Sequence, residues 1–176
     1  LGYRRMSFSP FTLQGQTFAG GGVELNPGKF RFGAFYGRLE KASSRITGNI
    51  LQPQYKRMAW GGKIGVGTDE EYLDVIFFRA RDKLNSLSDA TDSLRNQIPA
   101  RENMVVGLSS RLNFFDDHLS WKFDLAGSAY TRDMRQRQLD LQEGEVPGFL
   151  TDLYTPRTSS LYSWSGETSL TLNLDG

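Results

Sequence analysis

Few of the residue types that carry hydrolytic chemistry are present in this chain. Its 176 residues include one histidine, His118, and no cysteine. Catalysis by a serine nucleophile needs a histidine and an orienting partner beside the serine. His118 instead follows Asp116 and Asp117 in a short polar turn, where we expect a solvated side chain. We therefore predict no catalytic residue and no enzyme activity.

The sequence also lacks the patterns that bind metals and cofactors. Without cysteine there is no thiolate metal site. Neither glycine run, at residues 20–22 and 61–62, is followed by a helix start or by the Lys-Ser/Thr pair of a phosphate-binding loop. Glycine inside a strand more often marks a bend or a close backbone approach. We predict no metal ligand and no cofactor.

Charged side chains form the one pattern that could carry function. They recur in stretches where apolar and polar residues alternate with a period of two, which is typical of β-strands. Alternate residues of a strand point to opposite faces, so we predict that these charges share one face of a sheet. They would line a water-filled lumen, or pair with one another and fill it. The set is Arg31, Lys63, Arg111, Lys122 and Asp124, with Arg79 as a further candidate.

Large apolar side chains occupy the alternate positions of the same stretches. We predict that they form the opposite face of the sheet and meet lipid. They include Phe30, Phe32, Tyr36, Trp60, Ile64, Leu108, Trp121, Phe123 and Leu125. The alternating segments are residues 1–13, 17–25, 29–39, 55–67, 72–82, 103–115, 119–132 and 170–174, which predicts about seven or eight strands.

The connections between these segments alternate strictly between short and long. Residues 26–28, 68–71 and 116–118 form tight polar turns, whereas residues 42–54, 83–102 and 133–161 form long loops. Outer-membrane barrels have short turns at one rim and long loops at the other. Tilted membrane strands of about 9–11 residues also fit the segment lengths better than soluble strands of about 5–6 residues. We predict an all-β fold, an antiparallel transmembrane β-barrel or a segment of one, occupying residues 1–176 as a single domain.

Composition narrows the partners and leaves one alternative open. The net charge is +1, which gives no electrostatic reason to expect nucleic acid. We find no run of eighteen apolar residues, so a transmembrane helix is not predicted. Periodicity alone does not distinguish the inside of a barrel from its outside. A soluble calycin-like barrel whose aromatic face encloses a small apolar ligand is therefore the alternative.

The stretch SFSPFTLQGQTFAGGGVELNPGKFRFGAFYGRLEKA, residues 7–42, resembles outer-membrane β-barrel proteins of Bacteroidota. The resemblance rests on the hairpin GVELNPGKFRFG and continues more weakly through AWGGKIGVG (59–67) and PARENMVVGLSSRL (99–112). It covers about half of the chain and identifies a class of barrel rather than an activity.

The resemblance implies the outer membrane of a Gram-negative bacterium as the location. It implies a role as a pore, a transport or export component, or the scaffold of a surface complex. The partners would be outer-membrane lipid and other outer-membrane or surface proteins. Gly176 departs from the aromatic residue that usually ends such barrels, so we expect the chain to be a segment of a larger barrel.

Overall fold

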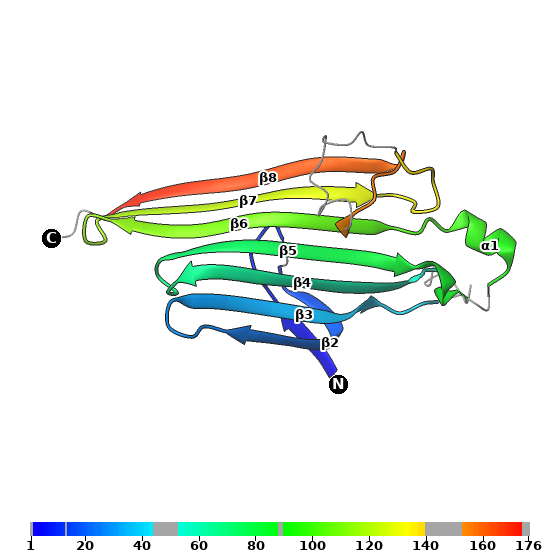
Figure 1. Ribbon diagram of the computed structural model, residues 1–176, viewed down its shortest axis with the longest axis horizontal. Helices are drawn as coiled ribbons and strands as arrows, with labels where there is room; N and C mark the ends of the chain where they lie inside the picture. Colours follow the sequence, from blue (N-terminus) through cyan, green and yellow to red (C-terminus); the bar gives the residue numbers. More distant parts are fainter. Residues whose placement is uncertain (1, 13, 44–52, 88–89, 140–152, 174–176) are drawn as a thin grey trace.

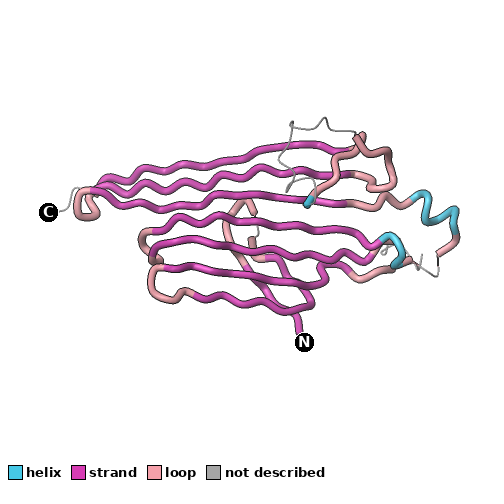
Figure 2. Tube along the Cα trace, in the orientation of Figure 1, coloured by secondary structure: helices cyan, strands magenta, loops and turns pink. Residues whose placement is uncertain are grey.

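The computed structural model describes residues 2–12, 14–43, 53–87, 90–139 and 153–173. Within these residues the chain forms one antiparallel sheet in which each strand pairs with the next along the sequence (Figures 1 and 2). The strands are β1 (Gly2–Met6), β2 (Gln16–Leu25), β3 (Phe30–Glu40), β4 (Lys56–Gly67), β5 (Tyr72–Lys83), β6 (Glu102–Phe114), β7 (Leu119–Thr131) and β8 (Ser160–Leu172). The helical content is small: η2 (Leu84–Ser86) and α1 (Asp92–Gln97). No helix of the described residues is long and apolar enough to cross a membrane.

The short turns all lie at one end of the sheet and the long connections at the other (Figure 1). Gly28 has a φ of 64° in the turn between β2 and β3, a conformation that glycine adopts without steric cost. Phe115, Asp116 and Asp117 have positive φ angles in the turn between β6 and β7. Asp tolerates this conformation well, and His118 closes the turn by donating its backbone N–H to the Phe115 carbonyl oxygen.

The sheet is not closed, so of the two forms predicted from the sequence, a barrel or a segment of one, the described residues do not form a complete barrel. Among the described strands, β1 pairs only with β2, and β8 pairs only with β7. β2 pairs with β1 through its first half and with β3 through its second half, and Gly20 pairs with both Gly2 and Gly37. The chain bends here, so that β1 and the residues after it cross the sheet instead of extending its edge (Figure 1).

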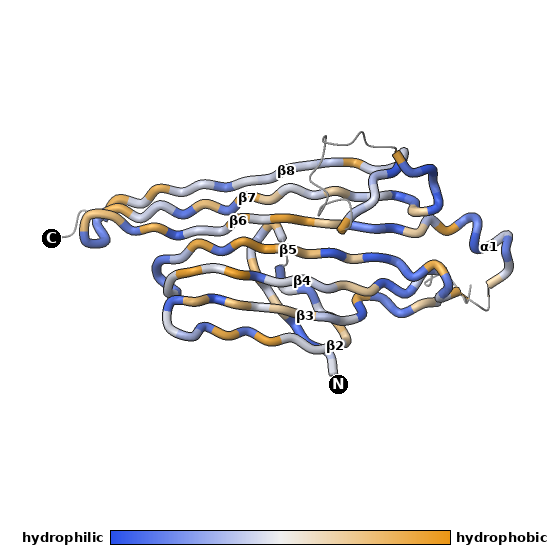
Figure 3. Tube along the Cα trace, in the orientation of Figure 1, coloured by the Kyte–Doolittle hydropathy of each residue, from blue (hydrophilic) through white to orange (hydrophobic). Residues whose placement is uncertain are grey.

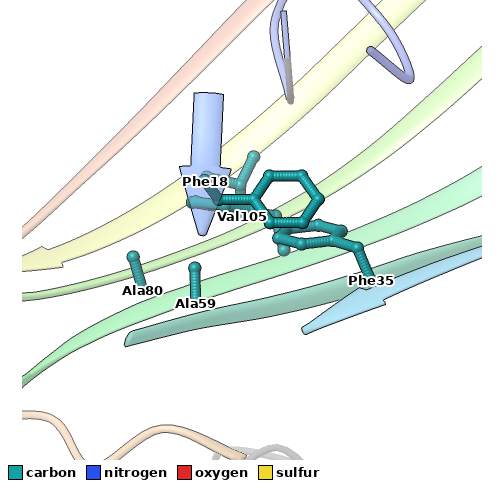
Figure 4. Close-up of a cluster of buried hydrophobic side chains, with 6 residues drawn as sticks. Phe18, Phe35, Ala59, Ala80 and Val105 are labelled. Carbon is teal, nitrogen blue, oxygen red and sulfur yellow. The ribbon is translucent and has the colours of Figure 1, made fainter. Parts of the chain in front are cut away.

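The crossing chain gives the sheet two different faces. Residues 7–12, which we call the crossing segment, lie against one face, which we call the covered face. The opposite face is called the open face. A buried apolar cluster of the covered face contains Phe18, Phe35, Ala59, Phe78, Ala80 and Val105, from β2 to β6 (Figure 4). Met6 and Phe8 pack against it from the crossing chain.

A second apolar core orders part of the long connections. It contains Tyr55, Leu87, Ala90, Ala100 and Met134. The backbone N–H of Met134 donates to the Ala100 carbonyl oxygen over 2.7 Å. Arg135 donates to Asp133 over 2.7 Å and to the Arg95 carbonyl oxygen of α1 over 2.7 Å. The loop end is therefore tied together by packing and by one guanidinium.

The bend in β2 predicts unequal effects at adjacent glycines. A Cβ at Gly20 would lie 2.2 Å from the Tyr36 carbonyl oxygen, whereas a Cβ at Gly21 would meet nothing within 4 Å. We expect Gly20→Ala to lower the free energy of unfolding by about 2 kcal/mol, because backbone atoms must move. Gly21→Ala, the matched control, should change it by less than about 0.5 kcal/mol. Urea unfolding measures both, and equal values would contradict the bend.

The contact between Asp133 and Arg135 predicts a pH dependence. Hydrogen bonds from the Arg135 side chain lower the pKa of the Asp133 carboxyl, and partial burial opposes them. A lowered folded-state pKa stabilises the fold above the unfolded pKa of about 3.9, and this stabilisation is lost as pH falls through the folded pKa. We therefore expect Asp133→Asn to have a lower free energy of unfolding than the unchanged protein at pH 7. On acidification, the free energy of unfolding of this variant should fall by less than that of the unchanged protein. Asp92→Asn, at an exposed ion pair, is the control; unfolding at pH 7 and pH 3 measures both.

Candidate functional site

The structure places all five charged residues of the predicted set on the covered face. One row of directly paired residues crosses β3 to β8, and directly paired side chains share a face. The row is Arg31, Gly65, Asp74, Ser109, Asp124 and Glu167. Lys63 lies in the next row of the covered face, opposite Gly33, and Arg111 lies opposite Lys122.

Arg79 does not join this set, which corrects the sequence-based expectation. It pairs with Trp60 and Met104 on the open face, where its guanidinium contacts Glu102 at 2.5 Å. The sequence hides this register because residues 76–78 are all apolar, so the alternation of β5 cannot be followed through them. In the structure Ile76 and Phe78 are buried on the covered face and Phe77 lies on the open face.

Arg31 is the most heavily bonded charge of the covered face. Its side chain is 10% exposed and donates to Asp74 over 3.0 Å and to Asp69 over 2.9 Å. It also donates to the Thr68 carbonyl oxygen over 2.7 Å and lies 4.7 Å from the centre of the Tyr72 ring. The ion pair thereby ties β3 to β5 and to the turn before β5.

Two other basic residues of the covered face are also paired. Lys63 lies 2.6 Å from Glu24. Arg57 donates two hydrogen bonds to Asp82, over 2.8 and 3.1 Å, and one to Glu40. Asp82 also accepts the backbone N–H of Arg101 over 2.8 Å. The prediction of a charged face did not identify these acidic partners, because alternation gives the face of a residue but not its cross-strand neighbour.

Glycine in the intervening strand allows these side chains to meet. Gly65 separates Arg31 from Asp74 in their row, and a Cβ there would lie 2.0 Å from Asp74 Oδ1. Gly33 separates Glu24 from Lys63 in the same way. Side chains of next-nearest strands therefore bond across a position that has no side chain.

The aromatic cluster uses the same arrangement. Gly61 lies between Phe35 and Phe78, whose rings stack with centres 6.1 Å apart. A Cβ at Gly61 would lie 2.8 Å from Phe35 Cε1. The glycines of β3 and β4 thus allow side chains of the neighbouring strands to come into contact on the covered face.

Arg111 and Lys122 are less well compensated. They are direct cross-strand neighbours of like charge, an arrangement that is unfavourable by itself. Lys122 lies 3.5 Å from Asp124, whose Oδ1 is buried without a hydrogen-bond partner among the described residues. Both basic residues line a cavity of about 480 Å³ near the short turns.

A second cavity, of about 490 Å³, lies near the long loops. Its lining includes Arg57, Arg101, Asn103 and Tyr130, and Thr12 of the crossing segment lines it as well. The apolar cluster of Phe18, Phe35 and Phe78 occupies the middle of the covered face between these polar ends. The covered face is therefore polar at both ends and filled with apolar side chains in the middle.

The turn between β6 and β7 holds His118 at the surface. Its Nδ1 lies 2.6 Å from the Phe115 carbonyl oxygen, so the ring contacts its own turn. Across the part of the chain that the structure describes, no three histidine, aspartate or glutamate side chains converge in a way that would hold a metal ion. The arrangement of the covered face is one of ion pairs and packing.

All nine residues predicted to meet lipid lie on the open face. One row crosses this face through Phe32, Ile64, Val75, Leu108 and Leu125, and another begins with Tyr36 and Trp60. Phe30, Tyr36, Ile64 and Leu125 are each about half exposed or more, between 45% and 59%. The alternation is visible along the strands in Figure 3. Contact with lipid itself stays a prediction.

Removal of one buried acid should test the pairing on the covered face. Asp74→Asn leaves the Arg31 guanidinium with only the exposed Asp69 as an ionic partner. We expect the free energy of unfolding to fall by about 3 kcal/mol, because the buried charge loses its compensation. Glu167→Gln, in the same row but exposed, is the matched control and should change stability by less than about 0.5 kcal/mol. Equal effects in urea unfolding would show that Arg31 does not depend on Asp74.

Comparison with known proteins identified no relative of this chain. Searches against family models, curated proteins and solved structures found no match to the chain.

Proposed function

We propose that this chain forms the wall of a β-barrel in the outer membrane of a Gram-negative bacterium. Its role there is that of a transport or export component or of a scaffold for a surface complex, without catalytic activity. The open face carries this proposal. It exposes large apolar side chains from β2 to β8, far more than isolated surface residues of a soluble protein would account for.

The dimensions of the apolar band agree with a membrane. On β7 the open-face residues run from Leu119 to Ala129, which is ten residue steps or about 33 Å along the strand. A strand tilt of about 40° converts this length into a height of about 25 Å, the height of the apolar band of outer-membrane barrels. Beyond the band the open face becomes polar: the row after Ala129 holds Arg81, Glu102 and Thr131. Glu102 also contacts Arg79, which lies in the last row of the band.

The covered face favours a filled interior over a permanently open pore. Its central charges are paired and its middle is occupied by packed aromatic rings. Lipid on the open face and other strands at the sheet edges would be the partners of such a wall. Other outer-membrane or surface proteins are partners that the scaffold role would require.

A soluble calycin-like barrel remains the second candidate function. It would need the aromatic face to enclose a small apolar ligand. Phe30, Tyr36 and Trp60 instead project from the face that the crossing segment leaves uncovered. This placement supports the membrane proposal.

Tryptophan fluorescence gives a direct test. All three tryptophans of the chain, Trp60, Trp121 and Trp164, lie on the open face. With the protein reconstituted into phospholipid bilayers, we expect brominated acyl chains to quench most of this emission. A Trp-free variant carrying Phe78→Trp on the covered face is the control, and its emission should be quenched much less.

Cell fractionation provides the second readout. The protein should stay with outer membranes after an alkaline carbonate wash. Release into the soluble fraction, together with tryptophan emission that is insensitive to brominated lipid, would overturn the membrane proposal and favour the ligand-binding barrel.

A further inference from the structure

The crossing segment fills a space that two glycines of the sheet leave for it. A Cβ at Gly33 of β3 would lie 2.9 Å from the Phe8 ring, and a Cβ at Gly107 of β6 would lie 2.3 Å from Thr12 Cγ2. The segment thus spans the covered face from β3 to β6. The centre of the Phe8 ring lies 6.0 Å from the centre of the Phe35 ring. The Nζ atom of Lys63 lies 5.8 Å from the centre of the Phe8 ring.

Among the interactions of the described residues, side-chain packing is what holds the crossing segment against the sheet. Within the described residues, its hydrogen bonds are local. Ser9 and Thr12 bond through their hydroxyl groups over 2.8 Å, Thr12 N–H donates to the Ser9 carbonyl oxygen, and the Ser7 hydroxyl accepts Gly15 N–H. None of these bonds reaches β3 to β7. Lifting the segment would therefore break no backbone ladder of the sheet.

The ion pairs beneath the segment close without it. Lys63 is paired with Glu24, and Arg31 with Asp74 and Asp69, all residues outside the segment. Removal of Phe8 and Thr12 from the covered face would leave these charges compensated. It would also uncover the middle of this face, between the cavities at its two ends, where Met6 of β1 is the other residue of the crossing chain that packs on the cluster.

We propose that the crossing segment is a displaceable internal plug. Seated, it packs on the aromatic cluster and blocks the way along the covered face. Displaced, it leaves a passage lined by paired charges and phenyl rings, while the sheet keeps its hydrogen bonds. The passage itself rests on the proposed barrel function, whereas the seating and release of the segment do not.

A designed disulfide tests the plug, because the chain has no cysteine of its own. The Cβ of Thr12 lies 3.7 Å from the position of a Cβ at Gly107, within the range of about 3.5–4.5 Å found in disulfides. Thr12→Cys with Gly107→Cys should therefore oxidise readily and lock the plug. Ser128→Cys with Ser163→Cys is the matched control, since these hydroxyl groups are 2.7 Å apart and join β7 to β8 without involving a residue of the segment.

Ion conductance across planar bilayers is the readout for passage in the full-length protein. We expect the locked variant to conduct at least about tenfold less than after reduction, with no change on reduction of the control. Phe8→Ala should raise conductance at least about tenfold, because the lost burial of a phenyl ring shifts the equilibrium towards the displaced state. Equal conductance of the locked, reduced and Phe8→Ala proteins would show that the segment is permanent filling.

Cysteine labelling separates failure of the plug from failure of the barrel. With Thr12→Cys alone, a bulky maleimide should react much faster than global unfolding, in a membrane or in detergent. Labelling no faster than unfolding, or absence of the disulfide with Gly107→Cys, would overturn the plug. If tryptophan emission shows that the protein is not in lipid, fast labelling would still support a displaceable segment, and only the barrel would be lost.

Discussion

Strand register is the constraint on which the other features of this molecule depend. In an antiparallel sheet, a slip of one residue moves every side chain of a strand to the other face. Apart from an irregularity between Arg38 and Glu40, the pairing of β3 to β8 keeps Phe32, Ile64 and Leu108 in one row. A slip of β4 would bring Lys63 into that row and place Ile64 among the ion pairs. The difference between the faces therefore stabilises the register in addition to the hydrogen bonds.

Burial explains why the charges of the covered face are paired. A guanidinium or ammonium group taken out of water needs close, well-directed acidic partners, or it destabilises the fold. Arg57 satisfies this requirement with two hydrogen bonds to Asp82 and one to Glu40. Arg111 and Lys122, beside a cavity at the end of the sheet, have access to water and need less compensation. Lys63, whose ammonium group lies 5.8 Å from the Phe8 ring of the crossing segment, is paired with Glu24 at 2.6 Å.

The alternation in the sequence was enough to predict β2 to β7 and the face of most residues, because it depends only on the local geometry of a strand. The prediction was wrong at the two ends: β8 begins at Ser160 and not at residue 170, and among the described residues of 1–13 only Gly2–Met6 form a strand. It correctly separated Arg31 and Lys63 from Phe32 and Ile64. It failed at Arg79, where the four consecutive apolar residues 75–78 conceal the register. It also missed Asp74 and Glu24 as partners and the fold of β1 across the sheet, because these depend on contacts between distant segments.

The glycines of β3 and β4 connect these observations. In a soluble sheet, glycine in the middle of a strand weakens packing. Here, Gly65 and Gly33 let ion pairs close across an intervening strand, and Gly61 lets two phenyl rings stack. Gly33 serves the crossing segment as well, by leaving room for Phe8. A larger residue at Gly33 would have to displace the Phe8 ring. The conformational cost of these glycines is thus offset by interactions that lie on the covered face, and the same absence of side chains that permits internal pairing also creates the seat of the crossing segment.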